Sequence, residues 1–69
     1  MKTKRIVITL DKLIKEKNMS KNKLCQLAGL QRTQLNSYCN NKVTRIDISV
    51  LERICSALDC DIKELFEMN

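Results

Sequence analysis

The sequence predicts an all-α domain of five short helices around one core, with a possible short strand near its N-terminal end. The 69 residues contain no proline, one glycine and 43% hydrophobic residues. This composition favours a folded, helix-rich chain over a disordered one. Apolar residues recur at helical spacing in several stretches that are separated by short breaks. The length allows one small domain, residues 1–69, which buries only about 60% of the surface of the unfolded chain.

The first two elements are an extended segment and a helix. Residues 4–9 read KRIVIT, and the alternation of Ile6 and Ile8 in a β-branched run favours an extended backbone. A first helix then follows at residues 10–17, with its lysines outside and Asn18 at its C-terminal end. Its inward face comprises Leu10, Leu13 and Ile14.

Two helices joined at Gly29 form the middle of the chain. Ser20 is a plausible N-cap for a second helix at residues 21–28. Gly29, the only glycine, readily adopts a positive φ and ends that helix. A third helix at residues 32–40 ends at Asn41, which tolerates the left-handed region. The inward residues are Leu24, Leu27 and Ala28 in the second helix, and Leu35, Tyr38 and Cys39 in the third.

The last third of the chain predicts a loop and two further helices. After a loop at residues 42–46, Asp47 caps a fourth helix at residues 48–58. Asp61 then caps a last turn or two at residues 62–67. The inward residues are Val50, Leu51, Ile54, Cys55 and Leu58 in the fourth helix, and Ile62, Leu65 and Phe66 in the last.

The outward face of the third helix has an unusual composition. At about 100° per residue, Thr33, Asn36, Ser37 and Asn40 point away from Leu35. Threonine, serine and asparagine are poorer helix formers than the glutamate, lysine and alanine that fill ordinary exposed faces. Their short hydroxyls and amides suit the base edges in a DNA major groove. A neutral surface helix without a ligand is the alternative interpretation of the same residues.

The charge is divided along the chain. Residues 1–23 carry eight basic and two acidic side chains, residues 24–45 carry three basic and none acidic, and residues 46–69 carry two basic and six acidic. The three net charges of +6, +3 and −4 add to the overall +5. A basic half beside an acidic half indicates a surface for a polyanion, although a generally solvated small protein is the alternative.

The four cysteines show no pattern of a metal site. They are 14, 16 and 5 positions apart, no pair has two-residue spacing, and the chain has no histidine. Zinc modules usually present paired ligands on tight turns. We therefore expect that the protein binds no metal. We also expect that the cysteines are reduced and lie in or near the core. They are Cys25, Cys39, Cys55 and Cys60.

Several function classes have no support in the sequence. Without histidine or a glycine-rich phosphate loop, we find no catalytic constellation, and we expect neither an enzyme nor a cofactor or small-molecule ligand. No apolar run is long enough to span a membrane, and the N-terminal residues do not read as a signal peptide. We expect no membrane partner and a cytoplasmic location.

Two stretches carry a family resemblance. They are MSKNKLCQLAGLQRTQLNSY at residues 19–38 and RIDISVLERICSALDCDIKELF at residues 45–66. The chain resembles the Cro/repressor-type (XRE-like) helix-turn-helix regulators. This resemblance implies a five-helix, lambda-repressor-like DNA-binding domain with its motif at about residues 20–40. It departs from the family pattern at Cys25, where alanine is usual, and at Gln31, where serine or threonine is the common cap.

The resemblance also implies a function and a site. The function is sequence-specific binding of double-stranded DNA by a transcriptional regulator of bacteria or their mobile elements, with a repressor favoured. In this family the N-terminal part of the second motif helix meets base edges in the major groove. Transferred by position, the base-reading residues are Arg32, Thr33, Gln34, Asn36 and Ser37. The expected phosphate contacts are Lys21, Asn22, Lys23, Asn40, Lys42 and Arg45.

A homodimer is expected, because one short helix reads too few base pairs for a genome of competing sites. The favoured dimer surface is the C-terminal region with Leu65, Phe66 and Met68. The extended segment at residues 4–9 could support it by pairing with its own copy, or could pair with the tail near residues 66–68 of the same chain. The alternative function is that of an antitoxin or adaptor, whose acidic half, residues 47–67, would bind a protein.

Overall fold

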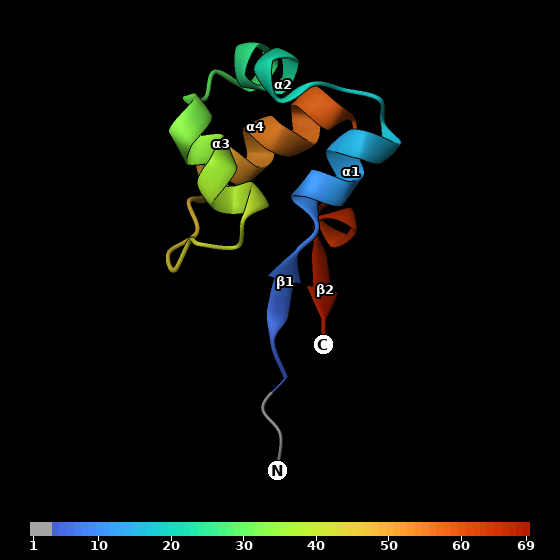
Figure 1. The fold of residues 1–69 in the computed structure, drawn as a ribbon, viewed down its shortest axis with the longest axis vertical. Helices are drawn as coiled ribbons and strands as arrows, with labels where there is room; N and C mark the ends of the chain where they lie inside the picture. Colours follow the sequence, from blue (N-terminus) through green and yellow to red (C-terminus); the bar gives the residue numbers. More distant parts are fainter. Residues whose placement is uncertain (1–3) are drawn as a thin grey trace.

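The computed structural model describes residues 4–69 and shows a small helical body with two paired strands at one end (Figure 1). The predicted extended segment and the first four helices are confirmed, the helices to within one residue at each end. The elements are β1 (Ile6–Ile8), α1 (Leu10–Glu16), α2 (Lys21–Ala28), α3 (Arg32–Cys39), α4 (Ile48–Leu58), η1 (Ile62–Glu64) and β2 (Phe66–Met68).

The predicted fifth helix is wrong, so the fold is not purely α-helical. Residues 62–67 instead form one 3-10 turn, η1, followed by strand β2. Strand β2 pairs with β1 in antiparallel register, with Ile8 opposite Phe66 and Ile6 opposite Met68. Pairing with the tail of the same chain was one of the two alternatives for the N-terminal segment. Backbone hydrogen bonds to a distant strand therefore override the local helical pattern of residues 62–67.

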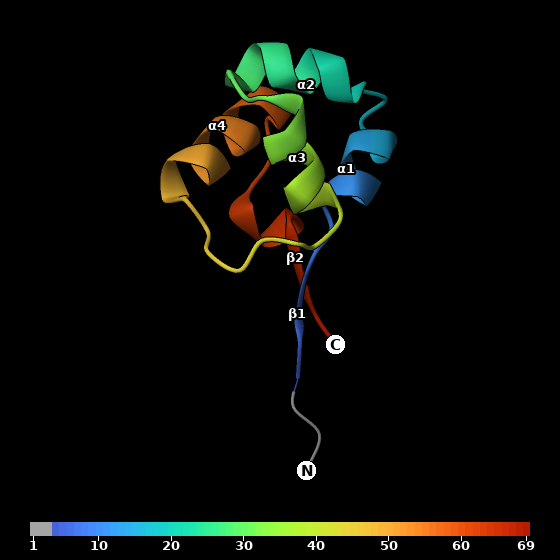
Figure 2. The ribbon, with the colours of Figure 1, turned by 60° about the vertical axis from the view of Figure 1, so that its left-hand side comes forward.

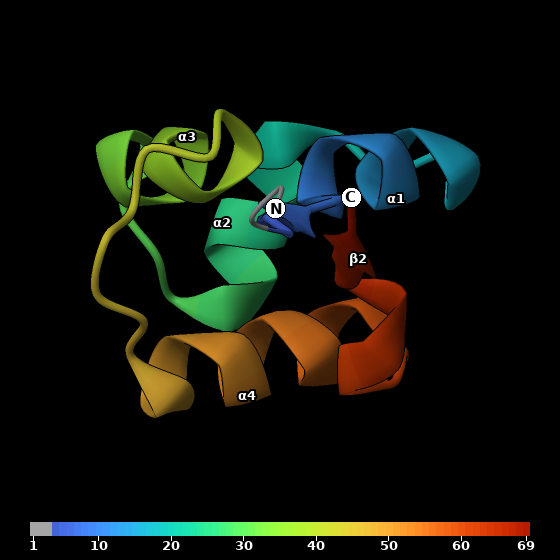
Figure 3. The same ribbon diagram turned by 90° about the horizontal axis from the view of Figure 1, so that it is seen from below.

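The helices form two sides of the molecule. Seen from below in Figure 3, α1 and α3 lie along one side and α4 along the other. Helix α2 packs against both α3 and α4 and so joins the two sides. The strands point away from this helical body (Figure 2). This arrangement places the outward faces of α3 and α4 on opposite sides of the protein.

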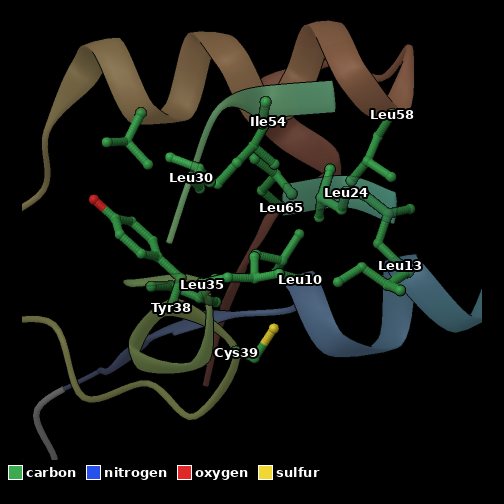
Figure 4. Packing of buried hydrophobic residues seen from close by; sticks show 14 residues of the cluster. Leu10, Leu13, Leu24, Leu30, Leu35, Tyr38, Cys39, Ile54, Leu58 and Leu65 are labelled. Atoms are coloured by element: carbon green, nitrogen blue, oxygen red, sulfur yellow. The ribbon is translucent and has the colours of Figure 1, made fainter. Parts of the chain in front are cut away.

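Every helix contributes to a single apolar core (Figure 4). Leu35 of α3 and Ile54 of α4 are completely buried at its centre. Tyr38 is also buried, and its hydroxyl oxygen accepts a hydrogen bond of 3.3 Å from the backbone N–H of Asp47. The largest fully buried side chains are Leu10, Leu24, Leu35, Val50, Ile54 and Leu65. All six were predicted to face inward.

Other predicted inward residues lie outside the core. Leu27 is 53% exposed and Ile62 is 49% exposed, so both predictions are wrong. Leu51 and Cys55 of α4 are only half-buried at the margin of the core, as is Phe66. A domain this small has too little interior for all its apolar positions, and some stay at the surface.

The predicted helix ends are largely confirmed. The Ser20 hydroxyl accepts from the backbone N–H of Lys23, and the Asp47 carboxylate accepts from that of Ser49. Gly29 ends α2 at a φ of 65°. Gln31 makes no side-chain cap for α3, as its departure from the family pattern indicated. Among residues 4–69, three residues other than glycine adopt the left-handed region, which asparagine and aspartate tolerate: Asn18, Asn41 and Asp59.

Asn41 has a second role that the sequence did not indicate. Its side-chain oxygen accepts a hydrogen bond of 2.6 Å from the N–H of Ile8, and its amide donates to the Ile8 carbonyl over 3.0 Å. The side chain thus occupies one position along the free edge of β1. It ties that strand to the C-terminal end of α3.

Candidate nucleic-acid interface

Helix α3 presents the predicted base-reading residues together on its outward side. Arg32, Thr33 and Gln34 are exposed, whereas Asn36 and Ser37 are half-buried. The opposite side of the helix is anchored by three buried residues, Leu35, Tyr38 and Cys39. Because these anchors fix the rotation of α3 about its axis, the five polar side chains are held at one surface.

The first turn of α2 lies directly beside this surface. The Arg32 guanidinium, through Nη1, donates a hydrogen bond to the side-chain oxygen of Asn22. Lys21 Nζ lies 3.4 Å from the side-chain oxygen of Asn36 and 3.9 Å from a carboxylate oxygen of Asp11. These contacts make Lys21 and Asn22 part of the same surface as α3. The contribution of Asp11 from α1 is not evident from the sequence.

The hydrogen bonds also define which polar atoms of α3 are already engaged. The Ser37 hydroxyl donates to the Thr33 carbonyl over 3.1 Å, a bond common for serine inside helices. The hydroxyl oxygen of Ser37 can still accept. The carbonyl oxygen of Asn36 is shared with Lys21, whereas its amide nitrogen makes no hydrogen bond among the described residues. Both side chains can therefore take part in further hydrogen bonds.

The remaining predicted phosphate contacts are all exposed. Lys23 lies in the first turn of α2, and Asn40 follows the last residue of α3. Lys42 and Arg45 lie on the connection from α3 to α4, beyond the C-terminal end of α3 (Figure 2). Asn40, Lys42 and Arg45 therefore follow α3 in the chain, whereas Lys23 is the neighbour of Asn22 in α2.

The charge division of the sequence becomes a division in space. No acidic residue occurs between Glu16 and Asp47, a segment that includes all of α2 and α3. The acidic residues of the C-terminal third lie at the N-cap of α4, on α4, in η1, in β2 and in the short connection between α4 and η1. Since α4 lies across the molecule from α3 (Figure 3), the two sides differ in charge. The α3 side is the one that suits a polyanion.

The cysteines lie where the sequence predicted, with all four free. Cys39 is buried, and burial raises the pKa of its thiol. Burial and the adjacent Cys55 thiol together raise the pKa of Cys60 to about 11. Within residues 4–69, no three metal-ligating side chains come together, and no helix has the length and apolar character needed to cross a membrane.

Helices α2 and α3 pack against each other and are joined by a glycine turn, and α3 carries an exposed polar face. This is the arrangement of the helix-turn-helix class of proteins. Comparison with known families agrees with this class. Residues 9–69 match the Cro/C1-type HTH DNA-binding domain. The chain therefore belongs to this family, and it functions in DNA-binding transcription regulation.

Individual relatives support this assignment. The chain is 32% identical over 60 residues to the SPbeta prophage-derived HTH-type transcriptional regulator YopS of Bacillus subtilis, covering 84% of this chain and 78% of that protein. It is 32% identical over 62 residues to the HTH-type transcriptional regulator YozG of the same organism, covering 90% and 74%. The crystal structure of the transcriptional regulator VanUg shares the fold, with a TM-score of 0.73, 24% identity, and coverage of 100% of this chain and 91% of that one.

Proposed function

We propose that this protein is a transcriptional repressor that binds a specific double-stranded DNA site in the cytoplasm, and that residues 1–69 fold as one domain. The exposed, acid-free face of α3 carries this proposal. In a major groove, Arg32 can bond two acceptors of a guanine and Gln34 can pair with an adenine. Thr33, Asn36 and Ser37 then meet the neighbouring base edges. The whole function depends on recognition, and it needs no catalytic group.

The residues around α3 hold the DNA backbone in this proposal. Lys21, Asn22 and Lys23 open α2, where backbone N–H groups and the helix dipole favour a phosphate. The contacts of Lys21 and Asn22 with α3 give them a second role, because they position Asn36 and Arg32. Beyond the other end of α3, the phosphate contacts are Asn40, Lys42 and Arg45. Such contacts fix orientation rather than sequence preference.

Binding to double-stranded DNA should depend steeply on salt. Each phosphate neutralised by the protein releases counterions, so the logarithm of the affinity should fall with the logarithm of salt concentration by about 0.9 per phosphate. Gel retardation or fluorescence anisotropy on duplex fragments at several salt concentrations measures this slope. Absence of binding at low salt, or an affinity independent of salt, would contradict the proposal.

The same proposal includes a homodimer. The strand end of the molecule exposes Ile6, Ile46 and Met68, beside the half-buried Phe66, and this apolar surface can be covered by a second copy. Leu65, which we expected to contribute, is 1% exposed and belongs to the core. Two α3 helices related by a two-fold axis would read half-sites about 34 Å apart.

Sedimentation with and without a palindromic duplex tests the dimer. We expect two protomers on each duplex at saturation, whether the dimer exists beforehand or assembles on DNA. Met68→Lys should weaken the dimer, because it places a charge in an apolar contact, while leaving the fold intact at a position that is 64% exposed. A single protomer bound per duplex at saturation would show that the homodimer is wrong.

A further inference from the structure

Helix α4 carries a second, partly exposed apolar stripe beside the one that faces the core. Val50, Ile54 and Leu58 are buried and form the stripe that faces the core. A second stripe runs beside it through Ile48, which is 71% exposed, and the half-buried Leu51 and Cys55. The three positions of this second stripe follow one another at intervals of three and four residues, as on one face of a helix.

The second stripe is one wall of an open groove. The lining residues are Ile48, Leu51, Glu52, Cys55, Cys60, Asp61 and Ile62. The segment after α4 forms the opposite wall, and Ile62 exposes 49% of its surface there. The backbone N–H of Cys60 donates to the Cys55 carbonyl over 3.1 Å, which holds the two walls together at the C-terminal end of α4. The stripe spans about 10 Å from Ile48 to Cys55, or two turns of a helix.

The charged residues at this groove have one sign. Glu52 and Asp61 are exposed and line it, and Asp59 and Glu64 lie close by in the chain. The one arginine of α4, Arg53, does not compensate them, because its Nη1 is directed to the α2 end, 3.3 Å from the Gly29 carbonyl oxygen and 3.5 Å from that of Ala28. Lys63 lies against a different depression, beside Lys12 and Glu16 of α1. The groove is therefore apolar with an acidic rim.

We propose that this groove binds an amphipathic helix of a second protein, with an apolar stripe for Ile48, Leu51 and Ile62 and with lysine or arginine beside it. Helices that dock into grooves present apolar anchors at intervals of three, four and seven residues, which is the spacing of the α4 stripe. Basic flanking residues complement Glu52 and Asp61. DNA and anionic membranes are repelled by the same acids. A second copy in two-fold contact here would oppose like charges.

The position of the groove permits a role in addition to DNA binding. Its walls are α4 and the segment after it, and α4 lies across the molecule from α3 (Figure 3). An occupant of the groove would leave the polar face of α3 uncovered. The protein can therefore recruit a partner while it is bound to DNA, and the groove shares no lining residue with the strand-end surface proposed for the dimer.

Two synthetic peptides provide the probe for this site. Both are helical and about five turns long, with the same leucine stripe, and one carries lysine where the other carries glutamate. We expect saturable binding of the lysine peptide, at least about tenfold tighter than that of the glutamate peptide. In methyl NMR spectra, the shifts should concentrate at Ile48, Leu51 and Ile62. Bound lysine peptide should also slow alkylation of Cys55 and Cys60 relative to Cys25.

Two variants make the result specific. Ile48→Ser should lower the affinity for the lysine peptide several-fold and leave DNA binding in gel retardation unchanged. Ile6→Ser is the control at the strand end, at a site of similar exposure, and it should leave the peptide affinity unchanged. Glu52→Gln should reduce the ratio of the affinity for the lysine peptide to the affinity for the glutamate peptide. Equal affinity for the two peptides, shifts centred on α3 or the strands, or no effect of Ile48→Ser would overturn the proposal. Concentration-dependent shifts at Ile48 and Ile62 without peptide would overturn it also, because a second copy would then occupy the groove.

Discussion

Replacing Leu35 with alanine is expected to abolish the cooperative fold. Leu35 is completely buried where α3 meets the core, so the change removes apolar contacts and leaves a cavity (Figure 4). Such substitutions cost about 2–5 kcal/mol. The core of a domain this small rarely supplies more than about 3–5 kcal/mol of stability. The free energy of unfolding of the variant should therefore fall near or below zero at room temperature.

Thermal and urea denaturation followed by far-ultraviolet circular dichroism measures this loss. Leu27→Ala is the matched control, because Leu27 is the same residue type in a neighbouring helix but is 53% exposed. It should change the free energy of unfolding by no more than about 0.5 kcal/mol. If the two variants unfold at similar urea concentrations, the described burial of α3 is incorrect.

Arg32→Ala should produce the second large effect, a loss of base preference. A side chain that bonds a guanine edge contributes about 1–3 kcal/mol of discrimination at one position of the DNA site. The variant should bind its best site less tightly and should accept other bases at that position. Lys42→Ala, in contrast, should lower the affinity for all DNA sequences by the same factor, because a phosphate contact does not distinguish between bases.

Affinities for a set of duplexes with single base changes distinguish these two outcomes. Asn22→Ala adds an informative variant, because Asn22 accepts a hydrogen bond from Arg32 and should hold that side chain in place. We expect it to weaken the same base preference as Arg32→Ala, but by less. Equal weakening of every duplex by Arg32→Ala would show that Arg32 contacts the backbone rather than a base.

The sequence predicts those parts of this fold that depend on neighbouring residues. Ser20, Gly29 and Asp47 mark helix ends through bonds and torsion angles within a few positions of themselves, and all three were recognised. Residues 62–67 were predicted to be helical, and pairing of the tail with the N-terminal segment was only one of two alternatives, because the partner of β2 is β1, at the other end of the chain. Nothing in the local pattern of residues 62–67 indicates that partner, and their apolar spacing is compatible with a helix.

The same distinction applies to the candidate site. The exposed polar face of α3 follows from helical periodicity alone, so its residues could be named in advance. The contacts between helices could not, because they depend on how α1, α2 and α3 cross. Asp11 beside Lys21 and Asn22 beside Arg32 are of this kind. The groove on α4 was missed because its stripe, with Leu51 and Cys55, was assigned to the core.

The pairing of β1 with β2 has a consequence for the order of folding. Thr9 bonds to the carbonyl oxygens of Leu65 and Glu64, and the latter lies 55 positions away in the chain. Joining such distant segments has a large entropic cost, because a long loop must close. Each helix turn forms between residues that are close in the chain and has no such cost. The helices should therefore assemble first and the sheet should close last. In the native state, the strand pairs should also open first, and amide hydrogens there should exchange before those of α2 and α4.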